Sequence, residues 1–216
     1  MGFKTWAVGE ILKAVDINQY LAKQVIAVVT SSTRPESPVE GQMIYETDTQ
    51  CLVLYTGSHW EVFSYHGPFK EYTPEWTATT TNPSIGNGTL RGYYRRLPGR
   101  TVHLRITWSR GTTTNMGSGA YSISLPPELP AETGTRWFGT GMFSLDPNEA
   151  SIFSAHPVIF AGSDGTKIDR IRWDDQGSDG IENWTDAGPT VSADWYAHFQ
   201  ILYETTAIDS NGNGGG

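Results

Sequence analysis

Hydrophobic and polar residues alternate along the stretch from Arg34 to Trp60, and this alternation predicts a small β-meander. We expect its strands at residues 42–46, 51–55 and 60–63, joined by two polar turns. A meander this short cannot bury enough apolar surface to fold alone. It therefore needs neighbouring chain, and identical copies of the same protein are the simplest source.

An amphipathic helix is expected before the meander, over residues 17–29. Asp16, followed by Gln19 three residues later, matches a capping box, which marks the start of a helix. The apolar stripe of this helix consists of Ile17, Leu21, Val25 and Val28. Two interpretations stay open: the stripe packs on its own domain, or it meets symmetry copies near a threefold axis. The pattern is too short for a free coiled coil.

From Trp76 onward, strand-length segments alternate with turns rich in Gly, Pro and Asn. Apolar and polar positions alternate most cleanly at residues 102–108 and 195–201. The expected strands are 76–80, 89–97, 101–110, 121–125, 136–143, 156–161, 168–173 and 193–205. This spacing predicts a two-sheet antiparallel β-sandwich, jelly-roll-like in its connections.

Turn residues divide the chain into four segments. Gly67-Pro68 and Pro74 mark the boundary before the sandwich. The segments are a helical N-terminal part (1–33), the meander (34–66), the sandwich (67–208) and a Gly-rich tail (209–216) that we expect to be disordered. The predicted fold class is therefore mainly β with a short N-terminal helix.

Composition bears on the fold class and on which classes of partner the protein can bind. The 216 residues are 38% hydrophobic, 12% aromatic and 18% charged, which favours a β-rich folded chain over a disordered one. The net charge of −8 argues against nucleic acid, whose phosphates require a basic surface. No run of about 18 apolar residues occurs and the N-terminus lacks a secretory pattern, so no membrane insertion is predicted. Cys51 is the single cysteine, so packing rather than an internal disulfide must hold the fold.

Charged residues are distributed unevenly within the sandwich segment. Arginines crowd its early strands: Arg91, Arg95, Arg96, Arg100, Arg105 and Arg110. Acidic residues crowd a later stretch: Asp164, Asp169, Asp174, Asp175, Asp179, Glu182 and Asp186. Either both groups are solvated surfaces, or the basic edge of one subunit meets the acidic edge of the next.

The sequence carries no recognisable catalytic motif. It contains no G-x-S-x-G elbow, H-E-x-x-H motif, P-loop or C-x-x-C pair. The five histidines are far apart in sequence, and no pair has the spacing of metal ligands. We therefore predict neither an enzyme nor a resident cofactor.

The acidic stretch 173–184 is the best candidate for a binding site. Its carboxylates and amides lie next to glycines and could hold calcium, although the stretch does not match an EF-hand loop. Two flanking Trp rings could stack on sugars. The candidate contacts are Trp173, Asp174, Asp175, Asp179 and Trp184. The alternative interpretation is an exposed acidic loop with two tryptophans that face the core.

Several motifs resemble parts of bacteriophage minor tail or tail-fibre proteins, especially those of actinobacterial phages. The similar segments in the N-terminal half are 6–12 (WAVGEIL), 15–21 (VDINQYL), 34–35 (RP), 40–49 (EGQMIYETDT), 54–57 (LYTG) and Trp60. Those in the sandwich are 82–94 (NPSIGNGTLRGYY), 111–114 (GTTT), 117–121 (GSGAY) and 124–126 (SLP). The resemblance covers most of residues 6–126 and weakens after them.

This resemblance implies a homotrimer on a virion, with an N-terminal anchor, a meander collar and a distal sandwich that faces a host glycan or protein. Trp6 is the candidate residue for anchoring to other virion proteins. The candidate trimer-interface residues are Ile17, Leu21, Val25, Val28, Met43, Tyr45, Leu52 and Leu54. The last four could form one shared core between three copies. No long shaft separates the modules, which implies a short fibre.

Four functional hypotheses follow, and the first is favoured. The chain is a minor tail protein or short tail fibre that contributes to host recognition, or a capsid-surface fibre or decoration protein. From other classes, it is a free carbohydrate-binding module or a wall-degrading enzyme. The favoured location is the virion, at the tail, with the capsid surface as the alternative.

Overall fold

The structure is a computed structural model that describes residues 7–11, 13–17, 26–144, 152–160, 163–174, 181–184 and 195–206. For residues 173, 174 and 181–183 only the backbone is described. The described part of the chain is mainly β, with 51% strand. This confirms the prediction of a mainly β fold. The described part divides into two compact units between Gly67 and Pro68.

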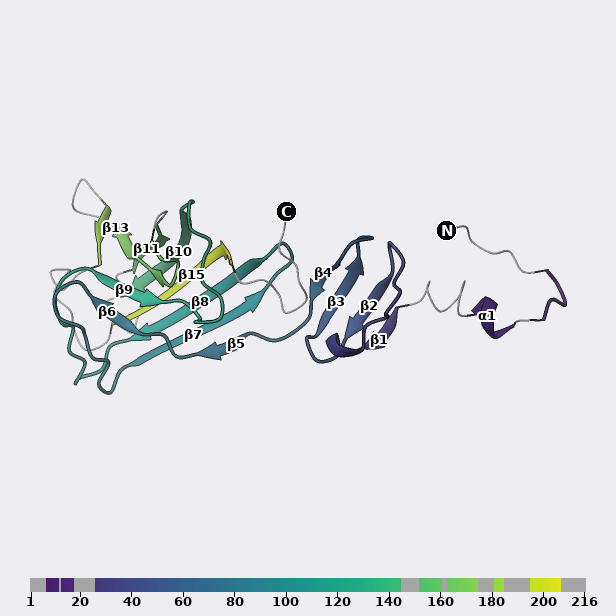
Figure 1. Ribbon diagram of the computed structural model, residues 1–216. Helices are drawn as coiled ribbons and strands as arrows, with labels where there is room; N and C mark the ends of the chain where they lie inside the picture. The colour runs from purple at the N-terminus through teal and green to yellow at the C-terminus, as the bar shows by residue number, and fades with distance from the viewer. Residues whose placement is uncertain are drawn as a thin grey trace. The chain divides into compact units, whose positions relative to one another are not determined.

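The smaller unit contains a four-stranded sheet in the order β1-β2-β3-β4 (Figure 1). Its elements are α1 (Ala14–Asp16), β1 (Ala27–Val29), the 3-10 helix η2 (Ser31–Thr33), β2 (Met43–Glu46), β3 (Cys51–Tyr55) and β4 (Trp60–Tyr65). Strands β2, β3 and β4 pair antiparallel, as the meander pattern predicts, and β1 pairs with β2 in parallel. One face of this sheet buries Ile44, Cys51, Val53 and Trp60, which form the core of the unit.

The predicted helix over residues 17–29 is wrong at its C-terminal end, because Ala27–Val29 form strand β1. The helix α1 covers only Ala14–Asp16. Two adjacent β-branched valines favour extended backbone, and pairing with β2 lets them pack on a sheet surface. Leu21 and Val25, from the middle of the predicted stripe, lie outside the described residues.

A buried ion pair joins the segment before β2 to the end of that strand. Arg34 Nε donates to Glu46 Oε1 over 2.5 Å, and Thr49 Oγ1 donates to Oε2 of the same carboxylate over 2.7 Å. The side chain of Glu46 is 0% exposed and that of Arg34 is 14% exposed. A carboxylate is tolerated in such a place only when it is paired and hydrogen-bonded, and here both oxygens have a donor.

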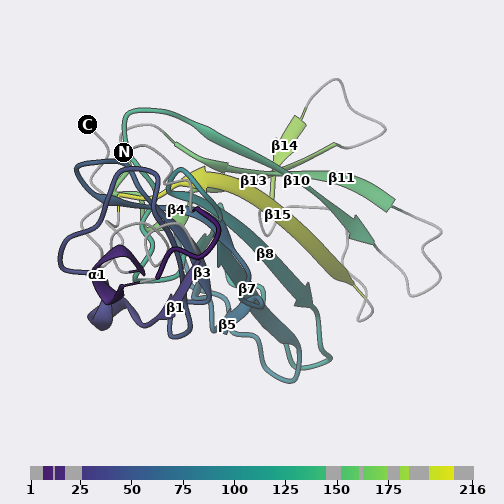
Figure 2. The ribbon, with the colours of Figure 1, turned by 90° about the vertical axis from the view of Figure 1, so that its right-hand side faces the viewer.

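The larger unit has an eight-stranded sheet in the order β14-β13-β11-β10-β15-β8-β7-β5 (Figure 2). It also has a three-stranded sheet in the order β12-β9-β6. The strands of the large sheet are β5 (Lys70–Tyr72), β7 (Thr89–Arg96), β8 (Thr101–Ser109), β10 (Trp137–Ser144), β11 (Ile152–Ile159), β13 (Arg170–Asp174), β14 (Ile181–Asn183) and β15 (Tyr196–Glu204). The small sheet contains β6 (Trp76–Ala78), β9 (Tyr121–Ser124) and β12 (Lys167–Ile168). Neighbouring strands within each sheet pair antiparallel, which is consistent with a β-sandwich.

The core of the larger unit joins side chains from both of its sheets. Alternate residues of β8 and β15 are buried, which confirms the predicted alternation. The buried residues are Val102, Leu104, Ile106 and Trp108 on β8, and Ala197, Phe199, Ile201 and Tyr203 on β15. The three-stranded sheet contributes Trp76, Tyr121, Ile123 and Ile168 to the same cluster. The intervening residues of β8 and β15 therefore face outward from the large sheet.

Trp184 is part of a dense aromatic group in this core. It is 3% exposed, and its ring stacks on Trp76 with 5.5 Å between centroids and 16° between planes. The rings of Trp108 and Tyr121 meet it edge-on at 5.2 and 4.9 Å. Its backbone N–H donates to the carbonyl of Ile171 on β13, and its carbonyl accepts from the N–H of Tyr121 on β9. Trp184 thus connects the two sheets.

The remaining differences from the predicted strands are local. The predicted strand 168–173 is two strands, β12 and β13, interrupted at Asp169, whose carboxylate accepts the backbone N–H of Phe160 over 2.7 Å. Strands β5 and β14 have three residues each, too few to produce a readable alternation, and the sequence pattern did not predict them.

Candidate functional site

The predicted contact residues of the acidic stretch are not brought together in the described structure. Trp184 is buried in the aromatic core, so the prediction that its ring stacks on a ligand is wrong. Trp173 and Asp174 end strand β13, and only their backbone is described. Asp175 and Asp179 lie outside the described residues. Among all the residues that the structure describes, no group of three or more His, Cys, Asp or Glu could hold a metal ion.

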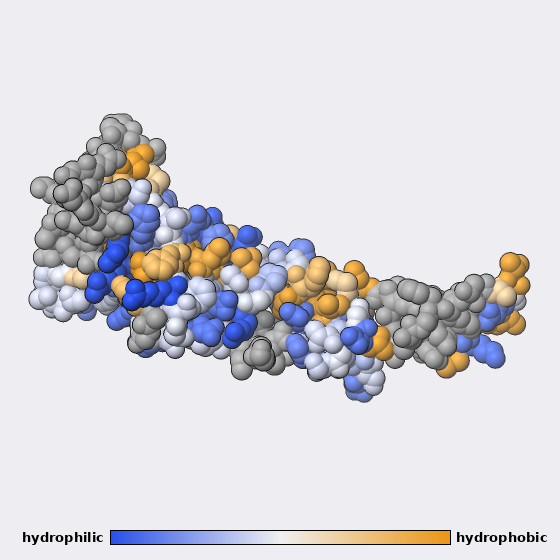
Figure 3. Space-filling view, turned by 90° about the horizontal axis from the view of Figure 1, so that it is seen from above, coloured by the Kyte–Doolittle hydropathy of each residue, from blue (hydrophilic) through white to orange (hydrophobic). Residues whose placement is uncertain are grey.

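The four-stranded sheet carries apolar side chains on the face opposite its core. We call this the assembly face and define it by Val28, Met43, Tyr45, Leu52 and Leu54. The strand register places Val28 beside Tyr45 and Tyr45 beside Leu52, with Met43 beside Leu54 in the next row. Val28 is 69% exposed and the other four are half-buried. Figure 3 shows hydrophobic side chains, in orange, grouped on the surface of this unit.

The assembly face unites five of the eight predicted trimer-interface residues. Val28 joins it through a strand and not through the predicted helix. Ile17 follows α1 and is 39% exposed, while Trp6, Leu21 and Val25 lie outside the described residues. This sheet has apolar residues on both faces, and the core of the unit covers one face. The other, the assembly face, has to be covered by another surface.

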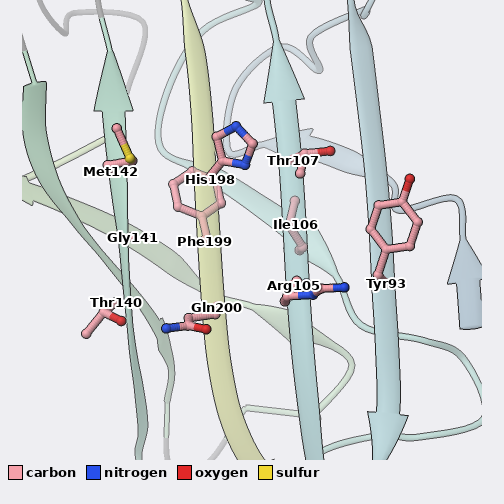
Figure 4. A pocket seen from close by; sticks show the side chains of 10 residues that line it. All are labelled: Tyr93, Arg105, Ile106, Thr107, Thr140, Gly141, Met142, His198, Phe199 and Gln200. Atoms are coloured by element: carbon pink, nitrogen blue, oxygen red, sulfur yellow. The ribbon is translucent and has the colours of Figure 1, made fainter. Parts of the chain in front are cut away.

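A groove crosses the outward face of the eight-stranded sheet, over strands β10, β15, β8 and β7 (Figure 4). Its volume is about 510 Å³, within the range of small-ligand sites. Two cross-strand rows line it: Thr140, Gln200, Arg105 and Tyr93 in one, and Met142, His198 and Thr107 in the other. The groove thus combines the aromatic ring of Tyr93 with hydroxyls, an amide, an imidazole and a guanidinium on four adjacent strands.

Glycines in β10 determine how closely this strand approaches its neighbours at the groove. A Cβ on Gly141 would lie 2.2 Å from the carbonyl oxygen of His198 on β15, which no side chain tolerates. A Cβ on Gly139 would lie 2.6 Å from the ring of Pro157 on β11. Pro157 donates no N–H, and the paired register of β10 and β11 is interrupted opposite it. Larger residues at these two positions would push the strands apart beneath the groove.

Two arginines share one aromatic ring beside the groove. The guanidinium carbon of Arg105 lies 3.7 Å from the centroid of Phe69, and that of Arg95 lies 4.9 Å from it. The His103 ring meets Phe69 edge-on at 5.2 Å. Cation–π attraction holds both guanidinium groups near this ring. We call Arg95 and Arg105 the arginine pair.

His103 lies beside both the arginine pair and the polar groups of the groove. Its Nε2 is 3.4 Å from Oε1 of Gln200, and a hydrogen bond there requires the proton on Nε2. Partial burial lowers the pKa of His103, and the positive charges of Arg95 and Arg105 lower it further, whereas the contact with Gln200 raises it. A net lowering keeps this imidazole neutral at pH 7, so that it can both donate and accept a hydrogen bond.

Part of this site could be predicted from the sequence. The alternation in β8 and β15 predicted which of their residues face outward, and the early arginines marked basic strands. Asp164 and Asp169, the acidic residues of the later stretch whose side chains are described, have local partners: Asp164 accepts from Thr166, and Asp169 accepts from Phe160. Whether a neighbouring subunit pairs with that stretch stays a prediction.

No helix in the part of the chain that the structure describes is long and apolar enough to cross a membrane. Comparisons with protein-family models, curated proteins and solved structures found no match. Function therefore has to be inferred from the residues of this chain.

Proposed function

We propose that this protein is a structural adhesion protein of a phage appendage, whose larger unit binds a saccharide on the host surface. The observation that carries the proposal is the groove over β10, β15, β8 and β7, with the aromatic ring of Tyr93 and several hydrogen-bonding side chains. The motifs shared with minor tail and tail-fibre proteins support the phage assignment. A jelly-roll-like sandwich that faces the host is part of the same proposal.

The position of the groove favours a saccharide. The backbone N–H and C=O groups of these central strands are used in the sheet ladders, so a ligand on the sheet face must be recognised by side chains. Sugar hydroxyls both donate and accept hydrogen bonds and suit Gln200, Thr140 and His198. The apolar face of a sugar ring suits the ring of Tyr93. The groove offers both kinds of contact within two neighbouring rows.

Filling the groove should weaken binding without unfolding the protein. Thr107 is half-buried on the outward side of β8, and a tryptophan there would occupy the space between the two rows. We expect Thr107→Trp to lower binding to actinobacterial cell-wall preparations at least about tenfold, because it removes several ligand contacts at once. Binding of the labelled protein to a panel of such preparations measures this.

Thr135→Trp is the matched control, since Thr135 is exposed in the segment before β10 and lies outside the groove. This variant should bind as the wild type does. Undiminished binding by Thr107→Trp, or wild-type protein that binds no preparation in the panel, would contradict the proposal. Locating the chain in a virion reconstruction would decide between tail and capsid surface.

We further propose that the protein assembles as a homotrimer through the assembly face, as members of the resembled family would. Leu52 lies beside Tyr45 in the row that also contains Val28, on the face opposite the unit's own core. We expect Leu52→Asp to convert trimers to monomers, because association would bury an unpaired carboxylate. Mass photometry measures the change.

Ser37→Asp adds the same charge at an exposed position of the same unit and should leave assembly intact. Trimers of wild-type stability formed by Leu52→Asp would place the subunit contact elsewhere. A wild-type protein that is monomeric and binds saccharide would instead support the free carbohydrate-binding module.

A further inference from the structure

The groove is bordered by positive charge on a chain that is acidic overall. Arg91, Arg95 and Arg105 lie on the outward-facing positions of β7 and β8, whereas the chain carries a net charge of −8. Glu71 is 3.8 Å from Arg91, but both side chains are more than half exposed, so water screens this pair strongly. Within the described residues, no carboxylate forms an ion pair with Arg95 or Arg105. The arginine pair is therefore available to an anion from outside.

Phe69 holds the arginine pair in place before any ligand binds. An aromatic ring attracts the cations but takes up no N–H donor in a strong hydrogen bond, so the donors at the guanidinium edges are not consumed by it. The guanidinium edge matches the geometry of a planar carboxylate, with two parallel hydrogen bonds. Because the two side chains are already restricted, less rotamer entropy is lost when a carboxylate arrives.

We propose that the ligand of the groove is a carboxylated saccharide, with its carboxylate on the arginine pair and its hydroxyls on the neighbouring polar side chains. This inference rests on the proposed function, because it names the ligand class of the same groove. Arg105 belongs to the same cross-strand row as Gln200 and Thr140. A saccharide that lies along this row can therefore meet the guanidinium, the amide and the hydroxyl.

Other anionic polymers fit the groove less well. A nucleic acid needs an extended basic surface, and three arginines on an acidic chain do not supply one. An extended peptide can gain affinity by pairing its main chain with a free sheet edge, whereas the strands beneath this groove lie inside the sheet. The observations therefore favour a saccharide, and an acidic peptide becomes an outcome of the test.

The test compares polygalacturonate with its fully methyl-esterified form, which has the same sugar units without the negative charge. Binding of each polymer to the intact protein is measured by biolayer interferometry at low and high salt. We expect polygalacturonate to bind at least about tenfold more tightly than the ester, and this preference to shrink as salt screens the arginines. Arg105→Gln should remove most of the preference.

Arg136→Gln is the matched control, because Arg136 also lies over a phenylalanine ring, that of Phe160 at 5.3 Å, but outside the groove. It should keep the preference of the wild type. Equal binding of acid and ester would contradict the carboxylate assignment, while the host-wall assay with Thr107→Trp would still decide the proposed function separately. Binding of neither polymer, or tighter binding of polyglutamate than of polygalacturonate, would also overturn the inference.

Discussion

Trp184→Ala is expected to destabilise the larger unit by about 3–5 kcal/mol, the usual cost of truncating a large buried aromatic side chain. The ring is 3% exposed and lies in contact with Trp76, Trp108 and Tyr121. Its loss would leave a cavity between the two sheets that these rigid neighbours cannot fill. In calorimetry, the unfolding temperature of the larger unit should fall by roughly 10 °C.

Phe138→Ala is the appropriate comparison, because Phe138 is an aromatic residue of β10 that is 66% exposed. This variant should change the free energy of unfolding by less than about 1 kcal/mol. If Trp184→Ala were as mild as Phe138→Ala, Trp184 would not hold the sheets together, and its role as a surface contact for a ligand would have to be reconsidered.

Arg34→Met should destabilise the smaller unit by about 3–5 kcal/mol, because it leaves the buried carboxylate of Glu46 without its cation. Among its described residues, the core of this unit contains only four buried apolar side chains, so a loss of this size is expected to unfold it. Hydrogen exchange of the backbone amides in β2 and β3 measures the effect within the intact protein.

The double variant Arg34→Met/Glu46→Leu should recover most of that loss, since a well-packed apolar pair is often as stable as a buried ion pair. The recovery is favoured further because Nη2 of Arg34 is buried without a hydrogen-bond partner in the described structure. Arg91→Met breaks the exposed pair with Glu71 and should have little effect on amide exchange in β7. Slow exchange in Arg34→Met, or a double variant no better than the single one, would refute this account.

Sequence patterns anticipated the elements whose residues alternate and failed where tertiary context decides. The meander strands and the buried side of β8 follow directly from period-two alternation. Val28 fits a helical stripe equally well in sequence, but an adjacent strand was available to pair with it. Trp184 sits next to carboxylates in sequence, which suggested a surface loop, whereas its ring completes the aromatic core.

The groove was not predictable from the sequence, and the reason is different. Tyr93, Arg105, Thr140 and Gln200 are far apart in the chain, and only the order β10-β15-β8-β7 places them in one row. That order is set by long-range pairing of strands, which local patterns do not encode. The outward residues of β8 and β15 were foreseeable on each strand separately, but those of β7 and β10, and the combination of all four strands into one site, were not.

Methionine footprinting on the intact protein tests the saccharide-binding groove most directly. Met142 lies in the groove on β10, while Met43 and Met116 are similarly half-buried but lie outside it. When the protein is oxidised with and without a bound cell-wall saccharide, we expect protection of Met142 and unchanged oxidation of Met43 and Met116. Oxidation of Met142 that bound saccharide leaves unchanged would contradict the placement of the ligand in this groove.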